Sequence, residues 1–234
     1  MREIVLDTET TGLDPAGGDR IVEIGAIELL NHMPTGNVYH QYINPERSMP
    51  AGAQAVHGLG DEFLADKPVF AAIATAFLAF VGTARLVIHN AAFDMKFLNA
   101  ELVRAGREPL PTSQALDTLE IARRKYSGAK NSLDALCRRF GIDNSRREKH
   151  GALLDSELLA EVYLELIGGR QPDFGLAGHA GATAGDTLAS SEIWKPKPRP
   201  APLPGRLNTQ EADRHRDFVN SLGDRALWLK FRQS

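Results

Sequence analysis

The chain has 234 residues, 43% of them apolar and 24% charged, so it can bury a sizeable core and wholesale disorder is excluded. Its formal net charge of −3 excludes a global polycation, so any contact with nucleic acid must be local. The single cysteine, Cys137, excludes an intramolecular disulfide framework and a cysteine-based zinc site. The N-terminus lacks the apolar core of a signal peptide, and no apolar run reaches the length of a membrane span. We therefore expect a cytoplasmic protein.

Apolar periodicity and turn residues predict the secondary structure of residues 1–167. In chain order, the predicted elements are a strand at 3–9, strands at 21–29 and 39–43 around a hairpin turn at 33–36, a helix at 68–80, a buried strand at 85–88, and helices at 92–105, 118–126, 132–140 and 151–167. Asp117 ends a further short strand, where we expect it to cap the following helix. An antiparallel start followed by alternating strands and helices indicates an α/β domain with a mixed sheet.

A change of composition near Gly168 divides the chain into three parts. We predict a globular domain at 1–170 and a Gly/Ala/Pro-rich linker at 171–206. Proline at every second position from Pro196 to Pro204 excludes a packed helix or strand there and favours an extended tether. Residues 207–234 regain helical character and apolar residues, which predicts a C-terminal segment that binds a partner.

Two acids follow the apolar part of the first predicted strand. Asp7 and Glu9 are two residues apart, so in a strand both carboxylates project from the same face. Like charges this close repel unless one is protonated or a cation lies between them. The alternative interpretation is a solvated strand end with surface acids.

Two later segments carry similar chemistry. Asp94 opens a helix directly after the buried strand at 85–88, at the kind of sheet edge where sites are built, although it could equally serve as a capping acid. His150 precedes Gly151, so we place it in a loop from which it could reach the site that Asp155 of the following helix helps to build. The alternative is a surface histidine before an ordinary helix.

Taken together, these four acids and one histidine indicate a hard-cation site. Several carboxylates without matching lysines suit Mg²⁺ or Mn²⁺ rather than Zn²⁺. Two such ions can activate water and stabilise the leaving 3′ oxygen during phosphodiester hydrolysis, and a histidine can accept the proton of the water.

The segments Asp7–Gly12, His89–Leu98 and His150–Asp155 resemble, in order and spacing, the three motifs of the DEDDh exonuclease family. The resemblance implies a ribonuclease H-like fold with a five-stranded mixed sheet flanked by helices, and 3′–5′ cleavage with two divalent cations. It also implies Asp7, Glu9, Asp94 and Asp155 as metal ligands and His150 as general base.

Three further segments, Val56–Pro68, Leu116–Leu119 and Asn131–Cys137, are similar to the proofreading epsilon subunits of bacterial DNA polymerase III. This similarity implies removal of mispaired nucleotides from DNA 3′ ends within a bacterial, nucleoid-associated replisome. It also implies that His57 and the backbone of Thr10 and Thr11 contact the terminal nucleotide, and that Asn90 and Phe93 line the same pocket. The alternatives are a plain loop histidine at His57 and a core position for Phe93.

The tail carries two short resemblances to the same family. Gln171, Phe174 and Leu176 resemble the anchors of a peptide that binds the beta sliding clamp. Leu227 and Trp228 resemble the end of the epsilon subunits, which docks on the polymerase alpha subunit. Exposed Leu and Trp on a tether are otherwise aggregation liabilities, which favours a partner.

Two other functions remain open at this stage. One is an exoribonuclease of the same fold, since no residue visibly reads a 2′-hydroxyl group. The other is a module that tethers clamp and polymerase without activity.

A basic cluster precedes His150 and could either contact phosphates or form a solvated surface. It comprises Arg138, Arg139, Arg146, Arg147 and Lys149.

Overall fold

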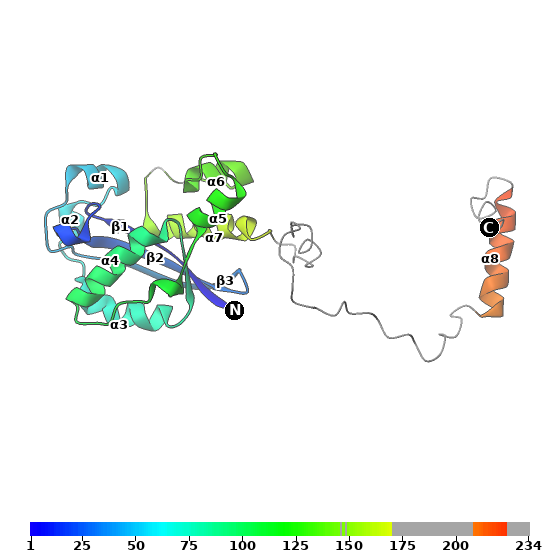
Figure 1. The fold of residues 1–234 in the computed structure, drawn as a ribbon, viewed down its shortest axis with the longest axis horizontal. Helices are drawn as coiled ribbons and strands as arrows, with labels where there is room; N and C mark the ends of the chain where they lie inside the picture. Colours follow the sequence, from blue (N-terminus) through cyan, green and yellow to red (C-terminus); the bar gives the residue numbers. More distant parts are fainter. Residues whose placement is uncertain (146, 148, 170–207, 224–234) are drawn as a thin grey trace, which may run out of the picture. The chain divides into compact units, whose positions relative to one another are not determined.

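The computed structural model of the chain describes residues 1–145, 147, 149–169 and 208–223. The chain divides into two units, Met1–Ala180 and Gly181–Ser234. The first unit contains a sheet flanked by helices, and the second contains helix α8 (Thr209–Ser221), which begins with a capping box between Asn208 and Glu211 (Figure 1). Among the described residues, no helix is both long and apolar enough to cross a membrane.

The sheet has five strands in the order β3-β2-β1-β4-β5. Its strands are β1 (Arg2–Thr10), β2 (Ile21–Leu30), β3 (Met33–Tyr42), β4 (Arg85–Ile88) and β5 (Ala115–Asp117). The first three pair antiparallel, and β4 and β5 continue the sheet parallel to β1. This arrangement confirms the predicted mixed five-stranded sheet and makes β1 its central strand.

Helices cover both faces of this sheet. Successive side chains of β1 point to opposite faces, and each face packs into its own hydrophobic core. Ile4 and Leu6 join the core under α3 and α4, whereas Val5 joins the core under α6 and α7. The helices of this unit are α1 (Ala51–His57), α2 (Asp61–Leu64), α3 (Phe70–Val81), α4 (Ala91–Arg104), α5 (Thr118–Lys125), α6 (Leu133–Phe140) and α7 (Ala152–Leu166), with short 3₁₀ turns at Pro15–Gly17 and Thr112–Gln114.

Most predicted elements are found within one or two residues of their expected ends, but the hairpin differs. Its turn lies at Asn31 and His32, both with positive φ, and residues 33–36 belong to β3. A two-residue turn with two left-handed residues matches the twist of paired strands, which outweighs the turn signal of the Pro34-Thr35-Gly36 segment. Helices α1 and α2 were not predicted, because they are short and begin without a side-chain cap.

Helix α7 packs on β1 and β2 at a point where β2 carries no side chain. A Cβ atom built on Gly25 would lie 2.2 Å from the carbonyl carbon of Ala152 and 2.3 Å from the nitrogen of Leu153. The hydroxyl of Ser156 also donates a hydrogen bond of 2.9 Å to the Gly25 carbonyl oxygen. The first turn of α7 therefore rests directly on the backbone of β2.

We predict that Gly25→Ala lowers the free energy of unfolding by about 1–3 kcal/mol, because the added methyl group meets helix backbone that cannot rotate away. Denaturant unfolding measures this change. The matched control is Gly52→Ala in α1, where nothing lies within 4 Å and alanine favours the helix. Equal stability of both variants would show that α7 is not seated on Gly25.

Candidate active site

The first two acids of the site lie near the end of the central strand. Asp7 pairs with Gly25 of β2, and Glu9 pairs with Glu23. On its other side β1 pairs with β4 as far as Val5 and Val87, so Asp7 lies beside the residues that follow β4. Glu9 is 8% exposed and Asp7 is partly buried. Asp7 and Glu9 thus lie next to the C-terminal end of β4, the neighbouring parallel strand.

Asp94 reaches the site from the first turn of α4. The turn between β4 and α4 places Asn90 at a positive φ of 69°, a conformation that asparagine tolerates better than most residues. Asp117 holds this turn, since its carboxylate accepts hydrogen bonds from the backbone NH groups of Asn90 (3.0 Å) and Leu119 (2.8 Å). Its predicted role as the cap of α5 is confirmed. Asp94 itself is 3% exposed and accepts a hydrogen bond of 2.7 Å from the Thr8 hydroxyl.

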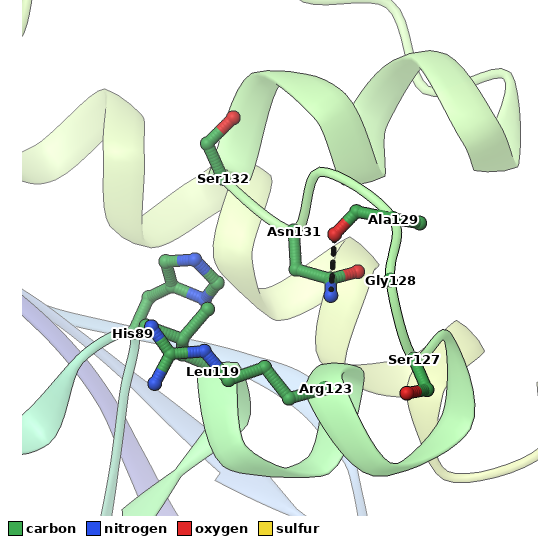
Figure 2. A pocket seen from close by; sticks show the side chains of 8 residues that line it. All are labelled: His89, Leu119, Arg123, Ser127, Gly128, Ala129, Asn131 and Ser132. Atoms are coloured by element: carbon green, nitrogen blue, oxygen red, sulfur yellow. Dashed lines mark hydrogen bonds between the residues drawn. The ribbon is translucent and has the colours of Figure 1, made fainter.

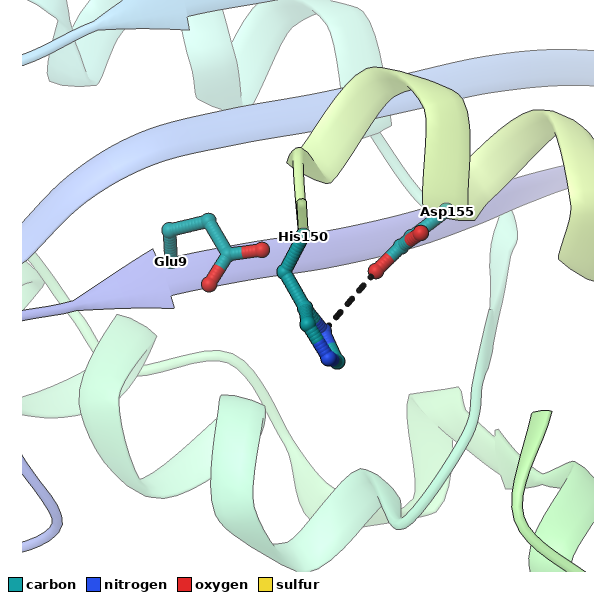
Figure 3. A group of neighbouring side chains, drawn as sticks. All are labelled: Glu9, His150 and Asp155. Carbon is teal, nitrogen blue, oxygen red and sulfur yellow. Dashed lines mark ion pairs between the residues drawn. The ribbon is translucent and has the colours of Figure 1, made fainter. Parts of the chain in front are cut away.

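Asp155 and His150 come from the first turn of α7 and the loop before it (Figure 3). The imidazole Nδ1 of His150 lies 3.3 Å from Asp155 Oδ2, and His150 is exposed whereas Asp155 is 2% exposed. The His150 backbone NH also donates to the carbonyl oxygen of Val56, which ties the loop to α1. The ligand atoms of Glu9, His150 and Asp155 all lie within 4.8 Å of one another. The predicted loop position of His150 is confirmed.

These residues line one cleft of about 310 Å³. Its predicted members are Asp7, Glu9, Asn90, Phe93, Asp94, His150 and Asp155. Phe93 also packs on Phe97 at a ring distance of 4.9 Å, so it serves the core and the cleft together. The structure therefore brings the acids, the histidine and two of the expected substrate contacts to one place.

Thr10, Thr11 and His57 are not among the lining residues of this cleft. The hydroxyl of Thr10 bonds the Gly12 carbonyl oxygen, and the backbone NH of Thr11 bonds the Arg20 carbonyl oxygen. His57 is buried and accepts a hydrogen bond from the backbone NH of Leu59. Contacts of these three residues with a nucleotide stay a prediction.

Burial and mutual repulsion oppose full ionisation of the acids. Burial, followed by the charges of Asp94 and Glu9, raises the pKa of Asp7 well above its usual range. Burial and the nearby Asp155 raise the pKa of Glu9 to about 8, and burial raises the pKa of Asp94 to about 7. Without added positive charge, this carboxylate set retains protons at neutral pH.

Asp155 behaves differently because it has a cationic partner. Burial opposes its ionisation, but hydrogen bonds from His150 and Arg147 lower its pKa below the usual value. Arg147 binds both carboxylate oxygens, with Nε 2.5 Å from Oδ1 and Nη2 2.6 Å from Oδ2, and also reaches Asp134 at 2.6 Å. Its side chain is 7% exposed. One guanidinium thus neutralises part of the set.

Sequence reasoning did not single out Arg147 or Asp134. Arg147 belongs to the basic cluster before His150, but the cluster gives no sign of which member turns inward. Arg139 instead covers the ring of Tyr126 at 4.4 Å, and the Lys149 side chain lies near Gly58. The available signal is an arginine of this cluster eight residues before an expected metal-ligand acid, which is too weak to identify a site residue by itself.

The donor set fits divalent cations. Four carboxylates from β1, α4 and α7 converge with one guanidinium among them, and oxygen donors of this kind suit hard ions such as Mg²⁺ and Mn²⁺. The pKa values of Asp7, Glu9 and Asp94 are raised because these buried carboxyl groups lie close together with too little positive charge nearby, and bound cations would supply that charge. The arrangement can hold cations against the backbone phosphate of a nucleic acid.

We predict that Mg²⁺ or Mn²⁺ stabilises the chain more at pH 8 than at pH 6. Without metal, Glu9 and Asp94 keep protons in the folded state that the unfolded chain has released above about pH 4. The stability they contribute is full below pH 4 and is lost as the pH rises through about 7 and 8, where cations can replace the departing protons. Saturating metal adds about 3 kcal/mol at 100 times its Kd, which raises the Tm by several degrees.

Thermal unfolding with metal or with chelator at both pH values measures the effect. Asp155→Asn should reduce the metal-induced rise in Tm, whereas the exposed Glu108→Gln should leave it unchanged. A rise that is equal at both pH values would contradict proton displacement.

Comparison with known proteins agrees with this geometry. Residues 4–163 match the family model described as exonuclease. The DNA polymerase III subunit epsilon of Rickettsia felis is 50% identical over 225 residues, covering 95% of this chain and 97% of the relative. The subunit epsilon of Escherichia coli is 49% identical over 176 residues, covering 72% of each chain.

Solved structures show the same fold. Exonuclease X in complex with 5′ overhanging duplex DNA has a TM-score of 0.54 and 25% identity, covering 70% of this chain and 90% of that one. The nuclease domain of 3′hExo, a DEDDh family member bound to rAMP, has a TM-score of 0.62 at 16% identity, covering 71% and 91%. These likenesses confirm the ribonuclease H-like exonuclease fold. The chain belongs to the exonuclease family and, within it, to the epsilon subunits of DNA polymerase III.

Proposed function

We propose that this chain removes mispaired nucleotides from DNA 3′ ends as the proofreading exonuclease of a bacterial DNA polymerase III. One observation carries the proposal: three separate segments of the chain bring Asp7, Glu9, Asp94, Asp155 and His150 to a single cleft. Full-length similarity to the epsilon subunits supports DNA as substrate and the replisome as its place of work.

In this proposal the chain's own residues hold the reacting groups in place. Asp7, Glu9, Asp94 and Asp155 hold two divalent cations, Mg²⁺ or Mn²⁺, which when bound supply electrostatic stabilisation of the phosphate and of the leaving 3′ oxygen. His150 accepts a proton from the attacking water. Its exposed imidazole lines the cleft. The imidazole Nδ1 lies 2.9 Å from Arg147 Nη2 and 3.3 Å from Asp155 Oδ2, and these two contacts orient the ring.

In this proposal, selectivity for mispaired ends follows from the small volume of the cleft. A mispaired terminus unpairs at lower cost than a paired one, and a cleft of about 310 Å³ accommodates an unpaired nucleotide rather than a duplex. Asn90 and Phe93 border the cleft and would contact the terminal sugar and base, with Phe93 offering a stacking surface. Thr10, Thr11 and His57 are not among the residues that line the cleft and would complete the nucleotide site after local adjustment.

The C-terminal segment is proposed to bind the polymerase alpha subunit, with the clamp-binding peptide at 171–176 as a second tether. Gln171, Phe174, Leu176, Leu227 and Trp228 lie outside the described residues. Helix α8 adds an apolar pair, since Phe218 and Leu222 are one turn apart and 60% and 43% exposed. An exposed apolar pair of this kind suits a helix that docks in a groove of a partner.

The experiment that tests the function is digestion of 5′-labelled DNA primers that end in a matched or a mismatched nucleotide, beside an RNA of the same sequence. We expect metal-dependent removal of 3′ nucleotides that is faster at the mismatch and absent with chelator. Faster digestion of RNA would support the exoribonuclease alternative. Failure to cleave with any metal would leave the tethering alternative.

In the same assay, His150→Ala should lower turnover by a factor of about 10² or more, because a general base is lost. The variant should keep the metal-induced rise in Tm that Asp155→Asn reduces. Equal loss of metal stabilisation in both variants would contradict the separate roles proposed for His150 and Asp155.

A second prediction concerns the tail. Replacing both Leu227 and Trp228 by alanine should weaken binding to the polymerase alpha subunit by about 30-fold or more, since apolar anchors dominate such interfaces. Surface plasmon resonance measures the affinity, and primer digestion by the isolated chain should not change. Gln210→Ala on the polar side of α8 is the control. Unchanged affinity of the double variant would remove these residues from the interface.

A further inference from the structure

A second hollow lies beside the catalytic cleft, between α5 and the start of α6 (Figure 2). Its volume is about 640 Å³, and it shares His89 and Ser132 with the catalytic cleft, so the two adjoin. We call it the α5 groove. It is lined by His89, Leu119, Arg123, Ser127, Gly128, Ala129, Asn131 and Ser132.

The α5 groove differs from the catalytic cleft in charge. The lining of the α5 groove holds one arginine and no acid, whereas the lining of the catalytic cleft holds five acids and one arginine. That arginine is Arg123, and its side chain extends along α5 towards His89 (Figure 2). Burial lowers the pKa of His89, and the charge of Arg123 adds to this effect. Arg123 is exposed and forms no ion pair with any residue of the described ranges. Its guanidinium is thus available to an anion.

The wall of the groove is fixed before any ligand arrives. The Asn131 side-chain amide donates to the carbonyl oxygens of Tyr126 (3.2 Å) and Ala129 (3.1 Å), and its oxygen accepts from Arg139 at 3.2 Å. Arg139 also donates to the Lys130 carbonyl oxygen and covers the Tyr126 ring. The loop between α5 and α6 is therefore held from both ends, and binding there would require little ordering.

The direction of the substrate strand connects the two hollows. At a 3′ end the terminal nucleotide occupies the catalytic cleft, so the remaining strand can continue only in its 5′ direction. Each further linkage carries a negative charge that the acids of the cleft repel and that a neighbouring cation attracts. The α5 groove adjoins the cleft, and Arg123 is the cation that lines it.

We propose that the α5 groove binds a backbone phosphate of the DNA strand on the 5′ side of the scissile linkage, with Arg123 as its principal contact. The proposal rests on the proposed function. Phosphate contacts position a strand without reading its sequence, so Arg123 would set how many nucleotides of unpaired strand the enzyme engages.

The test measures the affinity of the full chain for labelled single-stranded DNA in chelator, where no hydrolysis occurs. Single phosphates are replaced one at a time by uncharged methylphosphonates, starting from the 3′ end. We expect one linkage, 5′ of the terminal one, at which the replacement weakens binding by the wild type but not by Arg123→Gln.

Arg123→Gln should itself raise the Kd for single-stranded DNA about 5- to 20-fold, whatever its sequence. The slope of log Kd against log salt concentration should fall by about one, because one fewer counterion is released on binding. Arg123→Lys should recover part of the affinity. The matched control is Arg124→Gln, which removes the same charge from the next residue of α5 but lies outside the groove lining. Its response to methylphosphonates should equal that of the wild type.

The outcomes separate this proposal from the proposed function. Hydrolysis of the p-nitrophenyl ester of thymidine 5′-phosphate, which carries one phosphate, should be the same in wild type and Arg123→Gln. If both Gln variants lose affinity equally, or if no linkage depends on Arg123, the α5 groove is not a phosphate site, whatever the activity. If the wild type binds DNA as expected but hydrolyses neither DNA nor the ester, the proposed function fails while the groove stands.

Discussion

Mutual repulsion among four carboxylates near the end of the central strand is the constraint on which the rest of this structure depends. Asp7, Glu9, Asp94 and Asp155 interact closely enough to shift one another's pKa, and burial adds to the cost of charging them. Carboxylates that repel one another stay close only if rigid secondary structure holds their backbones in place. Here the stiffness comes from a central strand paired on both sides and from helices seated on each face of the sheet.

The supports of the acids are backbone features rather than side-chain packing alone. Asp117 ties the turn before α4 to the start of α5, because its carboxylate accepts hydrogen bonds from the backbone NH groups of Asn90 and Leu119. Gly25 lets α7 approach the sheet without an intervening methyl group. Arg147 supplies positive charge at one end of the set, where Asp155 stays ionised, while Glu9 and Asp94 hold protons. The cleft can thus exchange the protons of Glu9 and Asp94 for bound cations.

Much of this could be predicted from the sequence because strand ends and helix starts carry local signals. The alternation of Asp7 and Glu9, the buried strand before Asp94 and the loop position of His150 each follow from spacing. Arg147 could not be identified, because its inward position depends on contacts with Asp134 of α6 and Asp155 of α7, which lie on separate elements. The contact of Gly25 with Ala152 joins residues far apart in the chain, and no local pattern reports it. The hairpin turn was misplaced because two left-handed residues at Asn31 and His32 are set by strand pairing rather than by turn composition.

The packing of α7 on Gly25 also determines when the cleft is completed during protein synthesis. Three of the four acids belong to the first hundred residues, whereas His150 and Asp155 are the last residues of the site to be translated and must pack against strands made early. Pairing over such a separation waits until the whole segment is free to fold. A nascent chain still attached to the ribosome therefore lacks a complete hydrolytic centre until α7 has emerged and docked.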